Sequence, residues 1–287
     1  MKIAFVSLGC DKNLADTELM LEILRRKGYE FTDDAQEADA AVVNTCCFIG
    51  DAKEESINTV LELAELRREG RLKALVAAGC LAQRYGKEIR EEIPEVDGLV
   101  GTAAIEDILE AVETALSGEK RDFFRDLDSP PAVRRERVLT TGGHFAYLKI
   151  AEGCNKRCTY CVIPAVRGNY RSIPMEELTD QAEKLAEEGV RELILVAQET
   201  TLYGVDLYGE KSLPLLLRRL ARISGLYWIR ILYCYPEEIT EELISVMAEE
   251  PKICHYLDIP IQHSSDTVLK RMGRRTDQAQ LRRMIGL

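Results

Sequence analysis

Three cysteines within eight residues form the most distinctive group of reactive side chains in the sequence. Cys154, Cys158 and Cys161 have the spacing C-x3-C-x2-C and follow a short apolar run at residues 147–150. Thiolates are soft ligands that select iron–sulfur clusters, zinc or copper(I). A fourth cysteine would complete a closed site, but the next one, Cys234, is far along the chain. Three ligands with one coordination position left over predict a metal site that takes part in chemistry.

A structural zinc site, or three unrelated buried thiols, is the alternative interpretation of this spacing. The N-terminus lacks the features of an export signal, and no apolar run approaches the ~20 residues of a membrane helix. Nine cysteines are also an odd count in a chain of 287 residues. We therefore expect reduced, ligand-type cysteines in a cytoplasmic protein of about two domains rather than a disulfide framework.

The charge balance gives a weak indication of the partner. Acidic residues outnumber basic ones 49 to 38, for a net charge of −11, and 29 of the acidic residues lie before residue 140. An acidic surface repels phosphate backbones, so the composition favours a basic protein partner over a nucleic acid.

Strands that alternate with amphipathic helices must position the reactive groups of the first half. Short apolar or β-rich runs predict parallel strands at residues 2–7, 40–44, 74–78 and 98–100. Apolar residues at helical spacing, each set ending at a glycine, predict helices at 14–27, from about 57 to 70, and from 105 to 118. This alternation predicts a doubly wound α/β domain with a parallel sheet.

Three further cysteines occupy equivalent places in this domain. Cys10, Cys46 and Cys80 each follow a predicted strand directly. The carboxyl edge of a parallel sheet is where open α/β folds bind ligands, so three strands would deliver these thiols to one rim as a second cluster site. The alternative for any one of them is that a small buried cysteine packs well at a strand end.

The neighbours of these cysteines have simpler interpretations. Cys47 should point away from Cys46 along an extended chain, as a spare buried thiol. Asp-Lys-Asn at residues 11–13 and Asp16 lie at the start of the first helix, where Asp and Asn commonly cap free N–H groups.

Helical and strand periodicity is lost between residues 121 and 139, where turn residues and charges dominate. We interpret this stretch as a linker between a first domain of residues 1–120 and a second of residues 140–287.

The second domain resumes the alternation of strands and helices. Strands are predicted at residues 146–150, 192–197, 227–233 and 256–260, and helices at 175–188, 213–223 and 240–249, with Thr240 as an N-cap. This is the rhythm of a (βα) barrel, in which catalytic groups gather at the carboxyl ends of the strands. Four strands do not close a barrel, and residues 277–285 resemble a helix, so we expect an incomplete barrel in a sequence that is cut short.

Several polar residues lie at or near these strand ends. Gln198 and Glu199 follow one strand, and His263 follows another, while Arg230 lies within a strand and would need an anionic partner in the barrel interior. Structural or packing roles are predicted for the remaining candidates: His255, Cys234 and Cys254.

With both cysteine triads in view, the whole chain resembles the radical S-adenosylmethionine methylthiotransferases. Ser-Leu-Gly-Cys-Asp-Lys-Asn at residues 7–13, Val-Asn-Thr-Cys at 43–46 and Ala-Gly-Cys-Leu-Ala-Gln at 78–83 are similar to the N-terminal methylthiotransferase domain. Residues 154–161, with the aromatic Tyr160 before the last cysteine, are similar to the loop that holds the radical cluster.

The resemblance implies two [4Fe–4S] clusters and S-adenosylmethionine as both radical source and methyl donor. Cys154, Cys158 and Cys161 would hold the cluster whose electron cleaves S-adenosylmethionine to a 5′-deoxyadenosyl radical. Cys10, Cys46 and Cys80 would hold an auxiliary cluster that presents the sulfur to be transferred. Contacts to S-adenosylmethionine are expected from Tyr160, Gln198, Glu199 and Arg230. Because an unactivated C–H bond offers no acidic proton, cofactors must supply this chemistry.

Within that family the motifs Cys-Asp-Lys-Asn at residues 10–13 and Val-Ala-Gln-Glu-Thr-Thr-Leu-Tyr-Gly at 196–204 resemble the RimO-like branch, as does Tyr-Leu-Asp-Ile-Pro-Ile-Gln-His at 256–263. This branch modifies the β-carbon of an aspartate in ribosomal protein S12 of the small subunit. The resemblance implies that ribosomal substrate, an electron donor such as a flavodoxin or ferredoxin, and no membrane partner.

Two other functions stay open. The MiaB-like branch modifies isopentenyl-adenosine in tRNA, a substrate that the acidic balance disfavours. A two-cluster electron carrier would need fully ligated irons, whereas each triad leaves one iron open. The family's C-terminal TRAM module and last barrel strands have no counterpart in the 287 residues.

Overall fold

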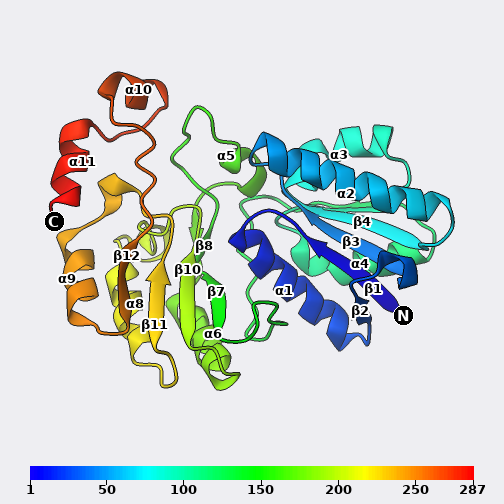
Figure 1. Ribbon diagram of the computed structural model, residues 1–287, viewed down its shortest axis with the longest axis horizontal. Helices are drawn as coiled ribbons and strands as arrows, with labels where there is room; N and C mark the ends of the chain where they lie inside the picture. Colours follow the sequence, from blue (N-terminus) through cyan, green and yellow to red (C-terminus); the bar gives the residue numbers. More distant parts are fainter. The chain divides into compact units, whose positions relative to one another are not determined.

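The computed structural model describes residues 1–287, which divide into two compact units. The first unit comprises residues 1–132, 136–138 and 165–167, and the second comprises residues 133–135, 139–164 and 168–287. Figure 1 labels their helices and strands in chain order. None of the helices combines the length and apolar character needed to cross a bilayer.

The first unit is built on a six-stranded sheet in the order β2-β1-β3-β4-β5-β6, and every pairing in it is parallel. Its strands are β1 (Lys2–Ser7), β2 (Glu30–Thr32), β3 (Ala40–Thr45), β4 (Ala74–Gly79), β5 (Gly98–Val100) and β6 (Arg121–Phe123). All residues of β3 and β4 are buried. Their continuous Ala- and Val-rich runs suit strands that are covered on both faces.

Helices cover both faces of this sheet (Figure 1). They are α1 (Asp11–Arg26), α2 (Gly50–Arg68), α3 (Cys80–Glu92) and α4 (Ile108–Leu116). On one face α1 packs against α4, and their apolar residues, such as Leu24 and Ile108, form a common core with Ile3 and Val42. On the other face α2 and α3 pack against β3 and β4. The predicted doubly wound α/β fold is confirmed.

The two outermost strands, β2 and β6, were not predicted. Each has three residues and lies at an edge of the sheet, where only one neighbour supplies hydrogen bonds. Such short strands carry too few residues for a periodic pattern. β6 begins the stretch of residues 121–139 that the sequence predicts as a linker.

The second unit contains a four-stranded parallel sheet in the order β12-β11-β10-β7. These strands are β7 (Phe145–Lys149), β10 (Glu192–Val196), β11 (Trp228–Ile231) and β12 (Ile253–Leu257). Helices α6 (Met175–Glu187), α8 (Leu213–Ala221) and α9 (Glu241–Glu249) bury their apolar faces against it. Together with its parallel βα order, this confirms the predicted incomplete (βα) barrel.

Shorter elements complete the chain. They are α5 (Ile163–Arg167), α7 (Val205–Tyr208), α10 (Asp266–Arg271), α11 (Gln278–Ile285), the antiparallel pair β8 (Ala151–Glu152) and β9 (Arg171–Ser172), and 3-10 turns at Ala35–Glu37, Ile105–Asp107 and Pro236–Glu238. The predicted N-cap of α9 is confirmed, since Thr240 Oγ1 accepts a hydrogen bond from Leu243 N at 3.2 Å.

One strand is displaced from its predicted position. The sequence predicts a strand at residues 256–260, whereas β12 starts at Ile253 and ends at Leu257. Its pairing with β11 shifts register between Ile229 and Ile231, so the side chains of β12 do not alternate regularly. Pro260 also has no N–H to donate, which explains why the ladder stops before it.

Candidate metal centres

Three thiols lie at the carboxyl edge of the first unit's sheet. Cys10 is the N-cap residue of α1, Cys46 directly follows β3, and Cys80 opens α3 directly after β4. Because β1, β3 and β4 are neighbours, their ends deliver the three cysteines to one part of one edge. The strand order also reverses between β1 and β3, and such a switch point is where open α/β sheets bind ligands.

Asn13 connects all three cysteine-bearing loops. Its side chain is completely buried, and Nδ2 donates to the carbonyl oxygens of Leu8 and Thr45 at 3.0 and 2.9 Å. Its Oδ1 lies 3.9 Å from Cys80 Sγ. One side chain therefore fixes the loop before Cys10, the end of β3 and the third thiol.

The capping role predicted for residues 11–13 and Asp16 is wrong. Cys10 is the N-cap, and no side chain accepts a capping hydrogen bond there. The polar side chains of this turn are buried instead: Asp16 Oδ2 accepts from Arg167 Nη1 at 2.7 Å, and Lys12 pairs with Asp11 at 3.0 Å. The polar side chains of this turn therefore contact other side chains and do not cap the N-terminus of α1.

Two glycines permit the close approach of these loops. Gly9 and Gly79 both have a φ of +89°, a left-handed conformation that favours glycine. A Cβ on Gly9 would lie 2.8 Å from Cys46 Sγ, and a Cβ on Gly79 would lie 2.7 Å from the Thr45 carbonyl oxygen. The glycine before Cys10 and the glycine before Cys80 thus let backbone pack directly against the Cys46 loop.

Burial makes the thiols of Cys46 and Cys80 weak acids in the protein without a metal. Burial raises the pKa of Cys80 to about 12, and the nearby Arg167 charge opposes that shift. Burial also raises the pKa of Cys46, and the neighbouring Cys10 raises that pKa further. A buried thiol gives up its proton when a bound cation compensates the thiolate, so metal binding here would release protons.

Cys47 lies beside the triad rather than in it. It is buried, and its Sγ lies 3.3 Å from the carbonyl oxygen of Cys80, to which the S–H donates. This contact ties the end of β3 to the start of α3.

The second triad lies in the loop between β8 and β9. These strands pair Ala151 with Ser172 and close the base of the loop. Gly153, with a φ of +78°, packs so tightly there that a Cβ would meet the Asn169 carbonyl oxygen. Thr159 anchors the tip, since its N–H donates to Met272 O at 3.1 Å. Cys154 and Cys158 are buried, and Cys161 is partly exposed.

Two cations lie over the ring of Tyr235, and its hydroxyl lies beside one of these thiols. Its hydroxyl is 3.6 Å from Cys158 Sγ, Lys156 Nζ lies 5.0 Å from the ring centroid, and the Arg274 guanidinium carbon lies 4.1 Å from it. Cations over an aromatic face are attracted by its quadrupole. Burial raises the pKa of Tyr235 above its usual value, so the hydroxyl keeps its proton.

Three carboxylates surround Lys156, and one of them, Glu199, is completely buried. Lys156 Nζ lies 3.9 Å from Glu199 Oε2 and 3.3 Å from Glu237 Oε1, and it donates to Glu238. Thr201 N donates to Glu199 Oε1 at 3.0 Å, whereas Glu199 Oε2 accepts no hydrogen bond although the residue is completely buried. Burial raises the pKa of Glu199 to about 7.

The structure separates the four predicted contacts to S-adenosylmethionine. Gln198 and Glu199 follow the carboxyl end of β10, and Gln198 Nε2 donates to Glu152 at 2.7 Å. Arg230 instead donates to Glu192 Oε1 at 2.7 Å, at the opposite end of β10. Tyr160, the fourth, is 49% exposed within the cysteine loop.

The remaining cysteines and histidines take no part in either triad. Cys234 is completely buried in the core of the second unit, and Cys254 is partly buried. His263 Nδ1 accepts from Ser265 N at 2.9 Å.

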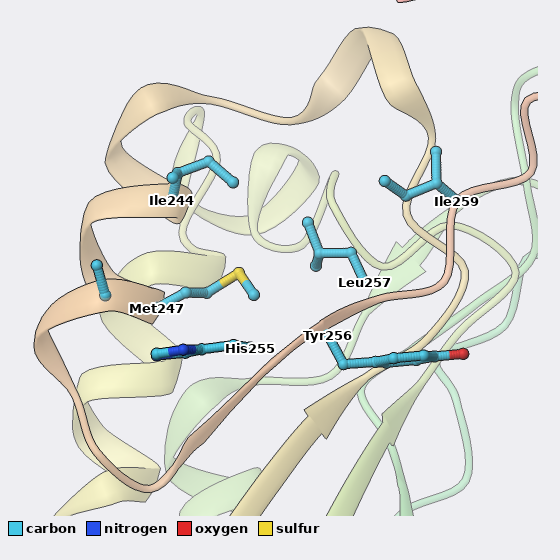
Figure 2. A pocket seen from close by; sticks show the side chains of 7 residues that line it. Ile244, Met247, His255, Tyr256, Leu257 and Ile259 are labelled. Atoms are coloured by element: carbon cyan, nitrogen blue, oxygen red, sulfur yellow. The ribbon is translucent and has the colours of Figure 1, made fainter. Parts of the chain in front are cut away.

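An apolar pocket lies between α9 and β12 in the second unit (Figure 2). Ile244 and Met247 come from the helix, and His255, Tyr256 and Leu257 come from the strand. None of its lining residues is a cysteine or a predicted contact to S-adenosylmethionine.

The two sets of residues fit iron–sulfur clusters by donor chemistry. Each triad offers three soft thiol donors, and no three His, Cys, Asp or Glu side chains converge on a single metal ion. A cluster spreads its cysteine ligands over separate irons. In the second unit, Glu199 Oε2, Gln198 Oε1 and the Tyr170 hydroxyl are buried polar atoms without a hydrogen-bond partner. They fit a polar ligand beside the second triad.

Sequence reasoning missed Arg167, Tyr235 and Arg274, which contact cysteine sulfurs. They lie 87, 77 and 116 residues from those cysteines. A buried arginine or tyrosine needs polar partners, and this requirement could have pointed to the thiols. The sequence did not predict that these three residues are buried, so the signal could not be used.

Two different family models match the first and the second part of the chain. Residues 2–101 match the family described as "Uncharacterized protein family UPF0004", and residues 148–286 match the radical SAM superfamily. A protein of Lachnoclostridium phytofermentans named "Ribosomal protein uS12 methylthiotransferase RimO" is 62% identical over 98% of this chain and 64% of its own length. A protein of the same name from Pelotomaculum thermopropionicum is 52% identical over 99% of this chain and 64% of its own length. The chain therefore spans slightly less than two thirds of the length of these curated relatives.

Solved structures are similar in fold at low sequence identity. The radical S-adenosylmethionine methyltransferase TsrM from Kitasatospora setae, with cobalamin and a [4Fe–4S] cluster bound, gives a TM-score of 0.65 at 16% identity over 99% of this chain and 67% of its own. The cobalamin-dependent S-adenosylmethionine radical enzyme OxsB gives a TM-score of 0.62 at 13% identity over 98% of this chain and 46% of its own.

Proposed function

Because this chain belongs to the radical S-adenosylmethionine methylthiotransferase family, we propose that it acts in inserting a methylthio group at the β-carbon of an aspartate in ribosomal protein S12. The observation that carries this proposal is the presence of two separate cysteine triads, one at the sheet edge of the first unit and one in the β8–β9 loop of the second. Methylthio insertion at an unactivated carbon requires a radical source and a sulfur source, and each triad would hold the cluster that supplies one of them.

In this proposal Cys154, Cys158 and Cys161 hold the radical cluster, and Cys10, Cys46 and Cys80 hold the auxiliary cluster. When bound, the clusters and S-adenosylmethionine supply the one-electron chemistry, the sulfur and the methyl group. A triad leaves one iron of a four-iron cluster without a cysteine, and that open position admits a ligand from outside the protein.

The chain's own residues bind, orient and exclude water. Glu199 and Gln198 present buried oxygens that accept no hydrogen bond at the carboxyl end of β10, where an amino group of S-adenosylmethionine would find acceptors. Tyr160, which is 49% exposed in the cysteine loop, would contact the same ligand in this proposal. Arg230 is the weakest of the predicted contacts, because its partner is Glu192.

The substrate and partners follow from the same family membership. The relatives' name specifies ribosomal protein uS12, and a net charge of −11 favours a basic protein surface over nucleic-acid phosphates. We include in the proposal a cytoplasmic location and an electron donor such as a flavodoxin or ferredoxin, since the radical cluster must be reduced before each cleavage.

A cleavage assay tests this function. The anaerobically reconstituted chain is incubated with S-adenosylmethionine, dithionite and a peptide carrying the ribosomal aspartate, and 5′-deoxyadenosine and the peptide mass are measured. We expect 5′-deoxyadenosine from the wild type and none from Cys158→Ala, together with a peptide mass increased by one methylthio group in place of hydrogen. Cys254→Ala is the matched control, because that thiol belongs to neither triad. Cleavage that is equal in wild type and Cys158→Ala would contradict the proposal.

A further inference from the structure

We propose that Arg167 is a positioning residue of the first unit's metal centre, which holds Cys80 and Asn13 in the arrangement that retains a cluster there. The inference rests on the proposed function, because it takes Cys10, Cys46 and Cys80 as the ligands.

Arg167 belongs to the first compact unit although it comes from the second half of the sequence. Residues 165–167, at the end of α5, pack with residues 1–132. Thr102 Oγ1 donates to the carbonyl oxygen of Val166 at 2.6 Å, which anchors the segment next to the arginine. Gly168 follows with a φ of +74° and ends α5 immediately after Arg167.

The guanidinium of Arg167 makes three different contacts in a buried site. The residue is 2% exposed; its Nε lies 3.4 Å from Cys80 Sγ, and its Nη1 donates to Asp16 Oδ2 at 2.7 Å. Its Nη2 donates to Asn13 Oδ1. A planar guanidinium presents its donors in a fixed fork, so these contacts restrict where the three partners lie relative to one another.

These contacts exceed what a buried ion pair requires. Asp16 alone would compensate the charge of Arg167. The remaining donors of the guanidinium contact Cys80, which is a predicted metal ligand, and Asn13, which holds the cysteine-bearing loops. Asn13 in turn holds Leu8 and Thr45, which precede the other two cysteines. Side chains that orient the residues bound to a metal commonly tune metal affinity, and hydrogen bonds to sulfur shift cluster potentials.

The test isolates the auxiliary cluster in a chain in which Cys154, Cys158 and Cys161 are all replaced by Ala. Into this background we would introduce Arg167→Gln, Arg167→Lys or, as a control, Arg67→Gln. Arg67 also forms a bidentate pair with a buried carboxylate of the first unit, Asp97, at 2.9 and 3.1 Å, and that pair has no cysteine contact. Iron and sulfide per chain, the cluster's midpoint potential and the melting temperature are measured for each.

We expect the background to retain about four irons, and Arg167→Gln to lose at least half of them or to shift the remaining cluster to a more negative potential. Arg167→Lys keeps a positive charge beside Asp16, so it should restore iron content, but it lacks the fork and should keep part of the potential shift. Arg67→Gln should lower the melting temperature and leave iron and potential unchanged.

Equal iron content and equal potential in Arg167→Gln, Arg167→Lys and Arg67→Gln would overturn the positioning role. A background chain that binds no iron and sulfide at all would instead overturn the proposed function, and the inference with it. The two failures are therefore distinguishable.

Discussion

Asn13 and Glu199 are both completely buried polar residues near predicted cysteine ligands, and their hydrogen bonding differs. Burying a polar group costs free energy unless it is hydrogen-bonded. Asn13 offsets that cost with two donated hydrogen bonds. Glu199 does so only in part, because Oε2 accepts none. The hydrogen bonds of Asn13 hold loops together, whereas Glu199 keeps one oxygen that can accept a hydrogen bond from a ligand.

Replacing Asn13 by Asp tests the organising role with almost no change in shape. The carboxylate cannot donate to Leu8 and Thr45, so two carbonyl oxygens lose their partner. We expect the first unit to lose about 2 kcal/mol of stability, within the range for buried unsatisfied groups. Urea unfolding followed by circular dichroism measures it, with the exposed Asn58→Asp as control. Equal midpoints for the two variants would contradict the role.

Replacing Glu199 by Gln tests the cost of its buried carboxyl. Burial raises the pKa from 4.5 to about 7 in the folded protein. A raised pKa means that the folded state binds the proton more tightly, so this stability is fully present below about pH 4.5 and is lost as the pH rises through about 7. Between about pH 5 and pH 8 the wild type should lose about 2 kcal/mol relative to Glu199→Gln.

Fluorescence of Trp228 reports this change, because it is the only tryptophan and lies in β11 of the second unit. Urea midpoints of the metal-free proteins are compared across that pH range. Parallel pH profiles for wild type and variant would show that the carboxyl titrates normally in the folded protein.

At the level of elements, the sequence predicted where the strands end. It did not predict which side chains from distant parts of the sequence contact those ends. Cys10, Cys46 and Cys80 were assigned to one edge because each follows an apolar run, and parallel strands end at the same edge. Periodicity does not reveal which distant side chains reach that edge. Arg167 is the last residue of α5, a proline-containing helix of five residues that is too short for a periodic pattern, so its approach to Cys80 depends on tertiary packing.

Replacing Gly79 by Ala tests the close approach of β4 to the Cys46 loop. A Cβ at Gly79 would lie 2.3 Å from Asn44 Oδ1 and 2.7 Å from the Thr45 carbonyl oxygen, at a φ of +89°. Gly70 also has a positive φ, +76°, but has nothing within 4 Å of the added Cβ. We expect Gly79→Ala to lower the melting temperature and iron content clearly more than Gly70→Ala does. Equal effects would mean that only the φ angle matters.

At the scale of the whole molecule, the two triads belong to two compact units with separate hydrophobic cores. The relatives named as ribosomal protein methylthiotransferases match almost the whole chain, whereas the chain spans 64% of their length. Their name is the ground on which the protein substrate is proposed here over the tRNA and electron-carrier alternatives. Two units with two donor sets predict that each cluster assembles independently of the other.

Iron and acid-labile sulfide per chain, measured after anaerobic reconstitution, test this claim most directly. We would compare the wild type with a variant in which Cys154, Cys158 and Cys161 are all Ala, and with one in which Cys10, Cys46 and Cys80 are all Ala. Two clusters that assemble independently would give about eight irons in the wild type and about four in each variant, with matching sulfide. Zinc without sulfide in the wild type would contradict this claim.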